Sequence, residues 1–192
     1  MTLTKILAFA GSTRTDSFNK KLVKIAAAGA KEAGTDVTII DLRDFQMPLY
    51  DEDLERQEGL PSNTRKLKEL MASHDGFLIA SPEYNSSISG VLKNTIDWTS
   101  RHSNGESPMS CFKDKVAGLM SASPGGLGGL RGLVHVRAIL ENMGVLVIPE
   151  QIAISKAHEV FNSDGFMNDP KQEQRIKSIG ANLAKILQKL NS

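Results

Sequence analysis

The stretch Gly11-Ser-Thr-Arg-Thr-Asp-Ser-Phe-Asn19 follows the apolar run Lys5-Ile-Leu-Ala-Phe-Ala10, and this junction decides the fold. The apolar run predicts a buried strand, and the pattern that begins near Phe18 predicts a helix after a short turn. A helix N-terminus offers unpaired backbone N–H groups and the positive end of the helix dipole, so the turn suits a phosphate. The turn contains neutral hydrogen-bond donors and the planar guanidinium of one arginine: Ser12, Thr13, Arg14, Thr15, Ser17 and Asn19.

The spacing of residues in this turn narrows the kind of phosphate that it suits. The pattern G-x-x-x-x-G-K-[ST] of nucleoside-triphosphate loops is absent from it. The dinucleotide pattern G-x-G-x-x-G is absent as well. The sequence therefore favours a single terminal phosphate over a pyrophosphate. The alternative is an ordinary helix N-cap whose hydroxyl groups face water.

Strand and helix patterns alternate along the rest of the chain without a break in composition. After the first strand, further strands are predicted at residues 36–42, 76–81, 115–122 and 145–148. Apolar residues at helical spacing predict helices at 18–33, 61–71, 92–99, 130–143 and 170–190. Five strands that alternate with five helices predict an α/β fold with a parallel sheet covered on both faces. Residues 45–59 and 101–114 are predicted to be irregular surface segments.

Composition indicates one ordinary globular domain, residues 1–192, with 40% hydrophobic and 23% charged residues. Lys and Arg number 23 and Asp and Glu 22, so the net charge of +1 gives no sign of a nucleic-acid partner. No apolar run approaches the ~20 residues of a membrane span, and the N-terminus lacks a signal-peptide pattern. Cys111 is the only cysteine, which excludes an intrachain disulfide. We therefore expect a cytoplasmic protein without a membrane partner.

The segment after the third predicted strand combines groups that suit a planar heterocycle. It reads Ser81-Pro-Glu-Tyr-Asn85, followed by Ser86. Pro82 restricts the backbone, while Glu83, Tyr84 and Asn85 bring an acceptor, an aromatic ring and an amide. The alternative is a turn in which Asn85 and Ser86 hydrogen-bond to their own backbone.

The segment after the fourth predicted strand is rich in glycine and reads Ser121-Ala-Ser-Pro-Gly-Gly-Leu-Gly-Gly129. Glycine lets a backbone approach a flat ligand closely, and it leaves residues 126–129 able to move. The alternative is a flexible connection without a ligand. Because parallel strands end at the same edge of a sheet, we expect all three polar segments to lie together, where such folds bind ligands.

Several motifs match, in order and in setting, those of one enzyme family. The pattern G-S-x-R-x-x-S-x-N matches at residues 11–19, and S-P-E-Y-N matches at 81–85. The sequence LKNTIDW at 92–98 and the segment PLYDED at 48–53 match as well. From about residue 5 to residue 150, the chain strongly resembles the NADPH-dependent FMN reductase family, whose fold is flavodoxin-like.

This resemblance implies a three-layer sandwich with strand order 2-1-3-4-5, with FMN as cofactor and NADPH, or alternatively NADH, as electron donor. The residues that it implies for the phosphate end of FMN are Ser12, Arg14, Ser17, Phe18 and Asn19. Those that it implies for the isoalloxazine are Pro82, Glu83, Tyr84, Asn85, Ser121, Ser123, Pro124 and Gly125. The rim toward NADPH and the second substrate is expected at Ser86, Arg101 and Gly126.

The implied reaction passes a hydride from NADPH through FMN to a small-molecule acceptor such as free flavin, a quinone, an azo compound or chromate. The flavin carries this chemistry, so no side chain is expected to be a catalytic acid or base. Arg101 is a candidate for binding the extra phosphate of NADPH, with a solvated arginine as the alternative. Ser86 and Ser89 stand where the family commonly has Gly and Pro, which leaves the acceptor open. The resemblance also implies a homodimer or homotetramer.

Two other functions remain open at this point: a flavodoxin-like electron carrier and a regulatory domain without flavin. Arg14 and the net charge of +1 count against the carrier, because flavodoxins typically have phosphate loops without arginine and an acidic surface. No metal site is expected, since His74, His102, His135 and His158 lack ligand spacing and are predicted to be surface or helix residues. Cys111 is not expected to be a nucleophile, Trp98 is expected on the buried side of its helix, and the acidic residues 52, 53 and 55 are expected to face water.

Overall fold

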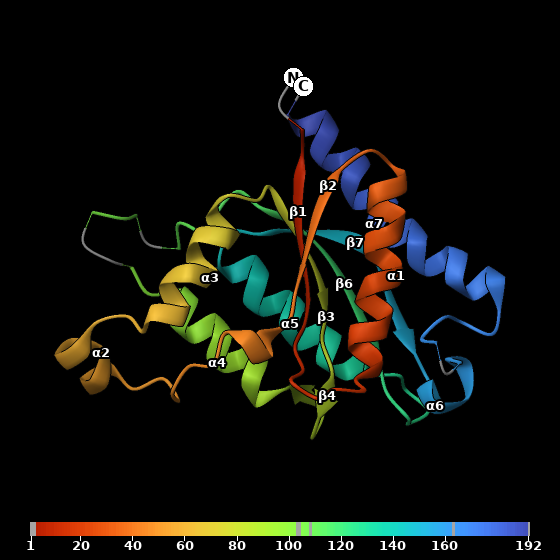
Figure 1. Cartoon of the computed structure of the whole chain (residues 1–192), viewed down its shortest axis with the longest axis horizontal. Helices are drawn as coiled ribbons and strands as arrows, with labels where there is room; N and C mark the ends of the chain where they lie inside the picture. Colours follow the sequence, from red (N-terminus) through yellow and green to blue (C-terminus); the bar gives the residue numbers. More distant parts are fainter. Residues whose placement is uncertain (1–2, 103–104, 108, 163, 192) are drawn as a thin grey trace.

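The computed structural model describes residues 3–102, 105–107, 109–162 and 164–191, and it consists of a sheet between two layers of helices (Figure 1). The long strands are β1 (Lys5–Ala10), β2 (Asp36–Ile40), β3 (Gly76–Ala80), β6 (Val116–Ala122) and β7 (Leu146–Ile154). They are parallel and lie in the order β2-β1-β3-β6-β7, which confirms the predicted order. Parts of two segments discussed above lie outside the described residues: residues 1 and 2 at the N-terminus, and residues 103, 104 and 108 of the irregular segment 101–114.

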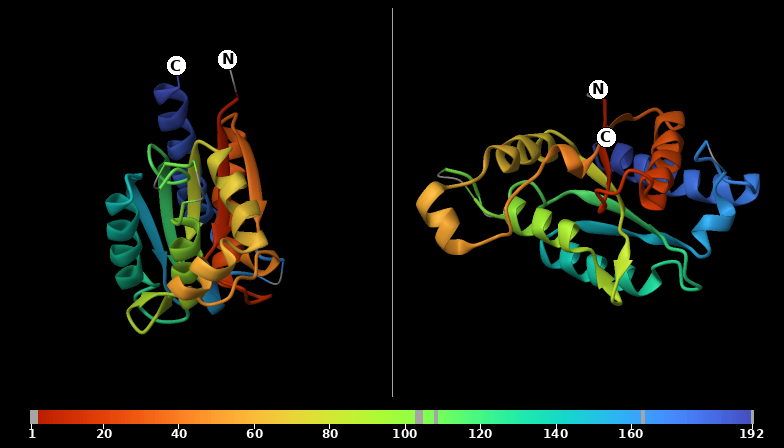
Figure 2. Two further views of the ribbon diagram at one scale, coloured as in Figure 1. Left: turned by 90° about the vertical axis from the view of Figure 1, so that its left-hand side faces the viewer. Right: turned by 60° about the horizontal axis from the view of Figure 1, so that its bottom comes forward.

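Helices cover both faces of this sheet. On one face lie α1 (Phe18–Glu32) and α7 (Pro170–Leu190), and on the other lie α3 (Ser62–Ala72), α4 (Gly90–Thr99) and α5 (Leu130–Asn142). The right-hand view of Figure 2 shows α1 and α7 on one side of the strands and α4 and α5 on the other. Among the described residues, no helix is long and apolar enough to cross a membrane.

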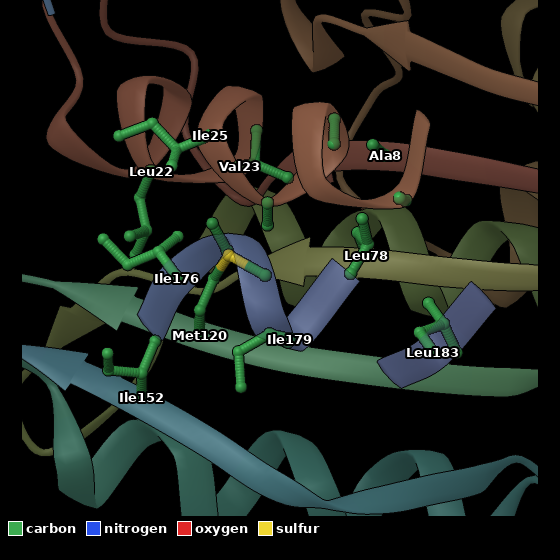
Figure 3. Close-up of a cluster of buried hydrophobic side chains, with 14 of the residues drawn as sticks. Ala8, Leu22, Val23, Ile25, Leu78, Met120, Ile152, Ile176, Ile179 and Leu183 are labelled. Carbon is green, nitrogen blue, oxygen red and sulfur yellow. The ribbon is translucent and has the colours of Figure 1, made fainter. Parts of the chain in front are cut away.

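The two cores follow from the alternation of side chains along the strands. Ile6 and Ala8 face the α1 and α7 layer, whereas Leu7 and Phe9 face the α3, α4 and α5 layer. All four are buried, which explains why the strand reads as a continuous apolar run. Figure 3 shows side chains of α1, α7 and the central strands meeting in the first core.

Helices α1 and α7 pack closely because two glycines lie in their contact. A Cβ atom on Gly29 would stand 2.1 Å from the Lys177 carbonyl oxygen, and one on Gly180 would stand 1.9 Å from the Ala26 carbonyl oxygen. Both distances are far shorter than atoms can approach, so only glycine allows the helix backbones this separation.

The structure contains short elements that periodicity does not predict. The hairpin strands β4 (Glu83–Tyr84) and β5 (Ser87–Ile88) follow β3, and α2 (Glu52–Glu58) lies inside the segment predicted to be irregular. The 3-10 turn η1 (Leu42–Asp44) ends the second strand early, and α6 (Ala157–Val160) follows β7. Elements of two to seven residues are too short to display a period.

Strand β7 also continues beyond its predicted end, through Pro149, to Ile154. Its pairing with β6 shifts register after Ala117, so the proline lies at an irregularity. Proline is tolerated there because β7 is an edge strand and the register shift removes the need for a donor.

Candidate functional site

The three polar segments singled out from the sequence all follow the carboxyl ends of β1, β3 and β6. Gly11 donates its N–H to the Ala80 carbonyl at 2.9 Å, and Ser81 donates to the Met120 carbonyl at 2.8 Å, so the ends of the three strands are directly joined. Figure 1 shows them at the lower edge of the sheet, beside the first turn of α1 and the hairpin. The expected gathering of these segments at one edge is therefore present.

The turn between β1 and α1 leaves the N-terminus of α1 open. Ser17 occupies the N-cap position and is buried, yet its side chain caps none of the N–H groups, and the first turn carries no acidic residue. The Ser12 hydroxyl accepts a hydrogen bond from the Arg14 N–H at 3.3 Å, and the Arg14 side chain lies at the exposed surface. Free helix N–H groups and the positive helix end suit a phosphate, and Arg14 brings a guanidinium to the same turn.

Arg43 holds this turn from the side of β2, a contact that the sequence did not reveal. Its Nε donates to the Thr13 carbonyl at 2.9 Å, and its Nη2 donates to the same oxygen. Arg43 belongs to η1, the turn that ends β2 earlier than predicted. The second strand was predicted to extend to residue 42 but ends at Ile40. The sequence pattern therefore did not indicate the turn η1, from which Arg43 contacts the phosphate turn.

Asn19 and Phe18, which the resemblance placed beside the phosphate, use their side chains for packing in this structure. The Asn19 amide donates to the Ala122 carbonyl at 2.9 Å and accepts from the Ala122 N–H at 3.0 Å, which ties α1 to the end of β6. The Phe18 ring stacks on Phe161, with centroids 5.9 Å apart. Contact of either residue with a ligand stays a prediction.

The segment after β3 forms a two-residue hairpin turn. Asn85 has a φ of 51° and Ser86 a φ of 65°, which is the pattern of a type I′ turn between β4 and β5. Glycine adopts such a φ readily and serine does so rarely, which accounts for the glycine that is common in the family at position 86. Tyr84 is half exposed on this hairpin, and Pro82 is buried against Gly11.

Glu83 does not face the open side of the hairpin but holds it against α5. Its carboxylate accepts hydrogen bonds from Arg131 Nε at 2.8 Å and Nη2 at 2.6 Å, and from the Gly132 N–H at 3.0 Å. The side chain is only 8% exposed. Burial alone would raise the pKa of Glu83, but the Gly132 hydrogen bond and the Arg131 guanidinium outweigh it, so the pKa lies below its ordinary value.

We expect Glu83→Gln to lower the free energy of unfolding by about 1–3 kcal/mol near pH 7, because a charged hydrogen-bonded pair is lost. A depressed pKa means that the ionised carboxylate stabilises the fold above the ordinary value of 4.5, and that this stabilisation disappears as the pH falls through the folded pKa. Denaturant unfolding of both proteins near pH 7 and about pH 3.5 measures this difference. An equal difference at both pH values would contradict it, and Glu52→Gln, on the exposed side of α2, is the control.

The glycine-rich segment is closely packed at its end, contrary to the expectation that residues 126–129 are free to move. Gly128 and Gly129 are buried with φ values of 63° and 90°. A Cβ on Gly129 would stand 1.9 Å from Ser121 Oγ, and one on Gly128 would stand 2.6 Å from the Ile154 carbonyl carbon. These two glycines therefore allow a tight turn, while Pro124, Gly125 and Gly126 are exposed.

The residues present at this edge fit the phosphate of FMN, and a cavity lies beside them. A cavity of about 310 Å³ lies between the phosphate turn, Tyr84 and the start of α4, and Arg14 lines it. A larger hollow of about 770 Å³ begins on the other side of the turn, at residues 15–17, and follows α1. Among the described residues, the buried hydroxyl groups of Ser81 and Ser121 lack a hydrogen-bond partner, which leaves polar capacity at the strand ends.

Arg101 lies far from this edge on the same chain. It follows α4, a helix of ten residues and about 15 Å in length that begins at Gly90. Its guanidinium lies 5.4 Å from the centroid of the Tyr50 ring, and its Nη1 is 3.4 Å from the Tyr50 hydroxyl. Binding of a phosphate by Arg101 stays a prediction.

Helix α4 also holds the segment after β2, the other stretch that matches the family. The Asn94 amide and the Trp98 indole both donate to the Pro48 carbonyl, at 2.9 and 2.8 Å. Trp98 is fully buried, as expected, and its ring meets Tyr50 edge to face. Glu52 and Asp53 face water as predicted, while Glu55 accepts a hydrogen bond from the Tyr50 hydroxyl at 2.9 Å.

His74 is an exception to the expectation that the histidines are surface or helix residues. It is buried between α3 and β3, with Nδ1 2.6 Å from the Leu70 carbonyl and Nε2 2.8 Å from Thr38 Oγ1. Its two ring nitrogens thus form hydrogen bonds with α3 and β2, and the local sequence does not indicate these partners. The other histidines, His102, His135 and His158, are exposed.

The described part of the chain contains no cluster of residues that could hold a metal ion. Cys111 is buried, and burial raises the pKa of its thiol to about 11. A protonated, buried thiol is a poor nucleophile, in agreement with its expected lack of a catalytic role.

Comparison with known proteins gives the family of this chain. Residues 4–159 match the family described as NADPH-dependent FMN reductase. The probable NADPH:quinone oxidoreductase 2 of Oryza sativa subsp. japonica is 35% identical over 91% of this chain and 84% of that protein. The NAD(P)H-dependent FMN reductase of Pseudomonas aeruginosa is 33% identical over 90% of this chain and 89% of that protein.

A solved structure agrees with these sequence relatives. The flavoenzyme NAD(P)H:(acceptor) oxidoreductase FerB from Paracoccus denitrificans superimposes with a TM-score of 0.81 at 27% identity, over 97% of this chain and 98% of that one. A flavodoxin from the domain Archaea, at 12% identity and a TM-score of 0.63, shares the fold. The family match, the relatives and the fold agree: the chain belongs to the NADPH-dependent FMN reductase family and is an oxidoreductase that uses FMN and NAD(P)H.

Proposed function

We propose that this protein passes a hydride from NADPH through bound FMN to a small-molecule acceptor such as a quinone, free flavin, an azo compound or chromate. The observation that carries the proposal is the turn between β1 and α1, which has the open N-terminus of α1 on one side and a cavity lined by Arg14 and Tyr84 on the other. An anionic phosphate satisfies the free N–H groups and the guanidinium together.

The residues of the chain bind and orient in this proposal. Ser12, Arg14 and Ser17 hold the phosphate together with the first N–H groups of α1, and Asn19 fixes α1 to β6. The segment 82–85 and the segment 121–125 line the isoalloxazine. FMN, when bound, accepts and donates the two electrons, and Glu83 keeps its charge on Arg131, away from the ring.

The rim residues Ser86, Arg101 and Gly126 form the proposed approach of the second substrate. Ser86 lies at the turn of the hairpin, and Gly126 lies in the exposed part of the glycine-rich segment. Arg101 is the proposed partner of the NADPH 2′-phosphate, which an extended dinucleotide carries far from its nicotinamide. Specificity constants for a panel of acceptors, with NADPH and NADH in turn, identify the preferred substrates.

We also propose a cytoplasmic homodimer or homotetramer whose interface lies near the flavin. Leu130 and Val134 are exposed apolar residues of α5, which packs against the hairpin with the half-exposed Tyr84, and the exposed Leu127 lies just before α5; they support an apolar contact there. The nearly neutral net charge of +1 supports small-molecule partners rather than nucleic acid.

The decisive experiment mixes the FMN-loaded protein with NADPH without oxygen and follows the visible absorbance of the flavin. We expect rapid bleaching, because an enzyme of this kind takes hydride from nicotinamide in its first half-reaction. Dithionite serves as the control that the bound flavin can be reduced. Bleaching by dithionite but by neither NADPH nor NADH would favour an electron carrier, and a protein that binds no FMN would overturn the proposal altogether.

A further inference from the structure

Ser89 connects helix α4 to the phosphate turn through one buried hydroxyl group. It is the N-cap residue of α4, immediately after the hairpin, and it is only 5% exposed. Its Oγ donates to the Gly11 carbonyl at 2.6 Å and accepts from the Leu92 N–H at 3.2 Å. The first contact joins α4 to the phosphate turn, and the second caps the helix.

Gly11 is the residue where the phosphate turn leaves β1, and its position is restricted on several sides. Its N–H donates to the Ala80 carbonyl at 2.9 Å. A Cβ at this position would stand 2.9 Å from Leu92 Cβ and 3.2 Å from Pro82 Cδ, so the backbone lies directly against the site's other elements. The Ser89 hydroxyl then determines where the Gly11 carbonyl points.

The direction of that carbonyl determines the direction of the next donor in the turn. The Gly11–Ser12 peptide is trans, since the described chain contains no cis peptide bonds. In a trans peptide, the N–H points opposite to the carbonyl. With the Gly11 carbonyl held by Ser89, the Ser12 N–H points away from the Ser89 hydroxyl.

The backbone at position 89 also suits the proline that is common in the family. Serine and proline therefore differ at this position chiefly in the side-chain hydroxyl group. Ser89 has a φ of −69° and a ψ of 150°, which lie in the range that proline adopts. Proline has no side-chain donor for the Gly11 carbonyl and no acceptor for the Leu92 N–H. The serine therefore supplies two hydrogen bonds that a family-typical residue lacks.

We infer that Ser89 is a positioning residue that orients the Gly11–Ser12 peptide for the FMN phosphate. The inference rests on the proposed function, because it requires that FMN binds at this turn. Ser89 acts through the peptide and not by contact with the ring, so its effect belongs to the phosphate end of the cofactor.

The test compares the binding of FMN and riboflavin, which lacks the phosphate, to the flavin-free protein and its variants. In Ser89→Ala and Ser89→Pro, we expect the Kd for FMN to rise about 3- to 10-fold, the range for loss of a neutral hydrogen bond. The Kd for riboflavin should stay within about twofold of its original value. Ser89→Thr retains the hydroxyl and should bind FMN as the unaltered protein does.

Each outcome supports or overturns the inference. Equal weakening of FMN and riboflavin would mean general damage to the site, and an unchanged Kd for FMN would mean that the hydroxyl does not orient the turn; either result overturns it. If Ser89→Ala fails to fold, Ser89→Pro keeps the test intact, because its backbone angles are already those of proline. Failure of the unaltered protein to bind FMN would instead overturn the proposed function.

Discussion

Arg14→Ala is expected to raise the Kd for FMN about 10- to 100-fold without changing the fold. Arg14 is exposed at the phosphate turn, so its removal leaves both cores intact. A hydrogen bond to a charged group contributes about 1.5–3 kcal/mol, and each 1.4 kcal/mol corresponds to about a tenfold change in Kd. Fluorescence titration of the flavin-free protein measures the Kd, and the unfolding midpoint shows that the fold is retained.

A matched control separates the specific contact from loss of charge. Arg56→Ala removes an equally cationic side chain from α2, where Arg56 is 70% exposed and pairs with the surface carboxylates of Glu52 and Asp53. Arg14→Lys should give an intermediate Kd, because an ammonium group keeps the charge and loses the planar fork. Equal FMN affinity of Arg14→Ala and Arg56→Ala would refute the phosphate assignment.

Gly180→Ala is expected to have the largest effect on stability, a loss of about 3 kcal/mol or more in the free energy of unfolding. The new Cβ would stand 1.9 Å from the Ala26 carbonyl oxygen, and a backbone atom cannot move aside as a flexible side chain does. Overpacking in a dense core costs about 1–3 kcal/mol even where side chains can adjust. The higher helix propensity of alanine recovers only about 1 kcal/mol.

Denaturant unfolding of the variant checks this expectation, with Gly90→Ala as the control. Gly90 lies in the first turn of α4, and beyond its chain neighbours and the nearby helix backbone no described atom lies within 4 Å of its Cβ position. Because α1 carries the phosphate turn, a displaced α1 in Gly180→Ala should weaken FMN binding as well. A midpoint equal to that of the Gly90→Ala variant would show that α1 and α7 are not held at the observed separation.

The apolar pattern was sufficient for the five long strands and for the edge at which the polar segments meet, while their order was implied by the family resemblance. A buried parallel strand such as Lys5–Ala10 reads as a continuous apolar run, and an alternating chain leaves few possible topologies. The hairpin at 83–88 and helix α2 were missed because they are shorter than the window in which a period appears. The extent of β7 was missed because Pro149 resembles the end of a strand.

Individual roles at the site were less accessible, because they depend on partners distant in the chain. The Asn19 amide hydrogen-bonds to Ala122, 103 positions away in the chain, and its contact with a phosphate stays a prediction. Arg131 holds the Glu83 carboxylate from 48 positions away, and the place of Glu83 beside the flavin ring stays a prediction. His74 was expected at a surface or in a helix, and its burial depends on Thr38.

By itself, the sequence determined the class of fold, the family motifs and the chemical character of each segment at the sheet edge. These properties are local, because the period of apolar residues and the identity of donors and acceptors can be determined from residues that are close together in the sequence. Only the tertiary structure decided which donor meets which acceptor: Arg43 with Thr13, Arg131 with Glu83, and Ser89 with Gly11. Those pairings follow from the burial of both faces of the sheet, which brings distant segments together and requires that their polar groups be satisfied there.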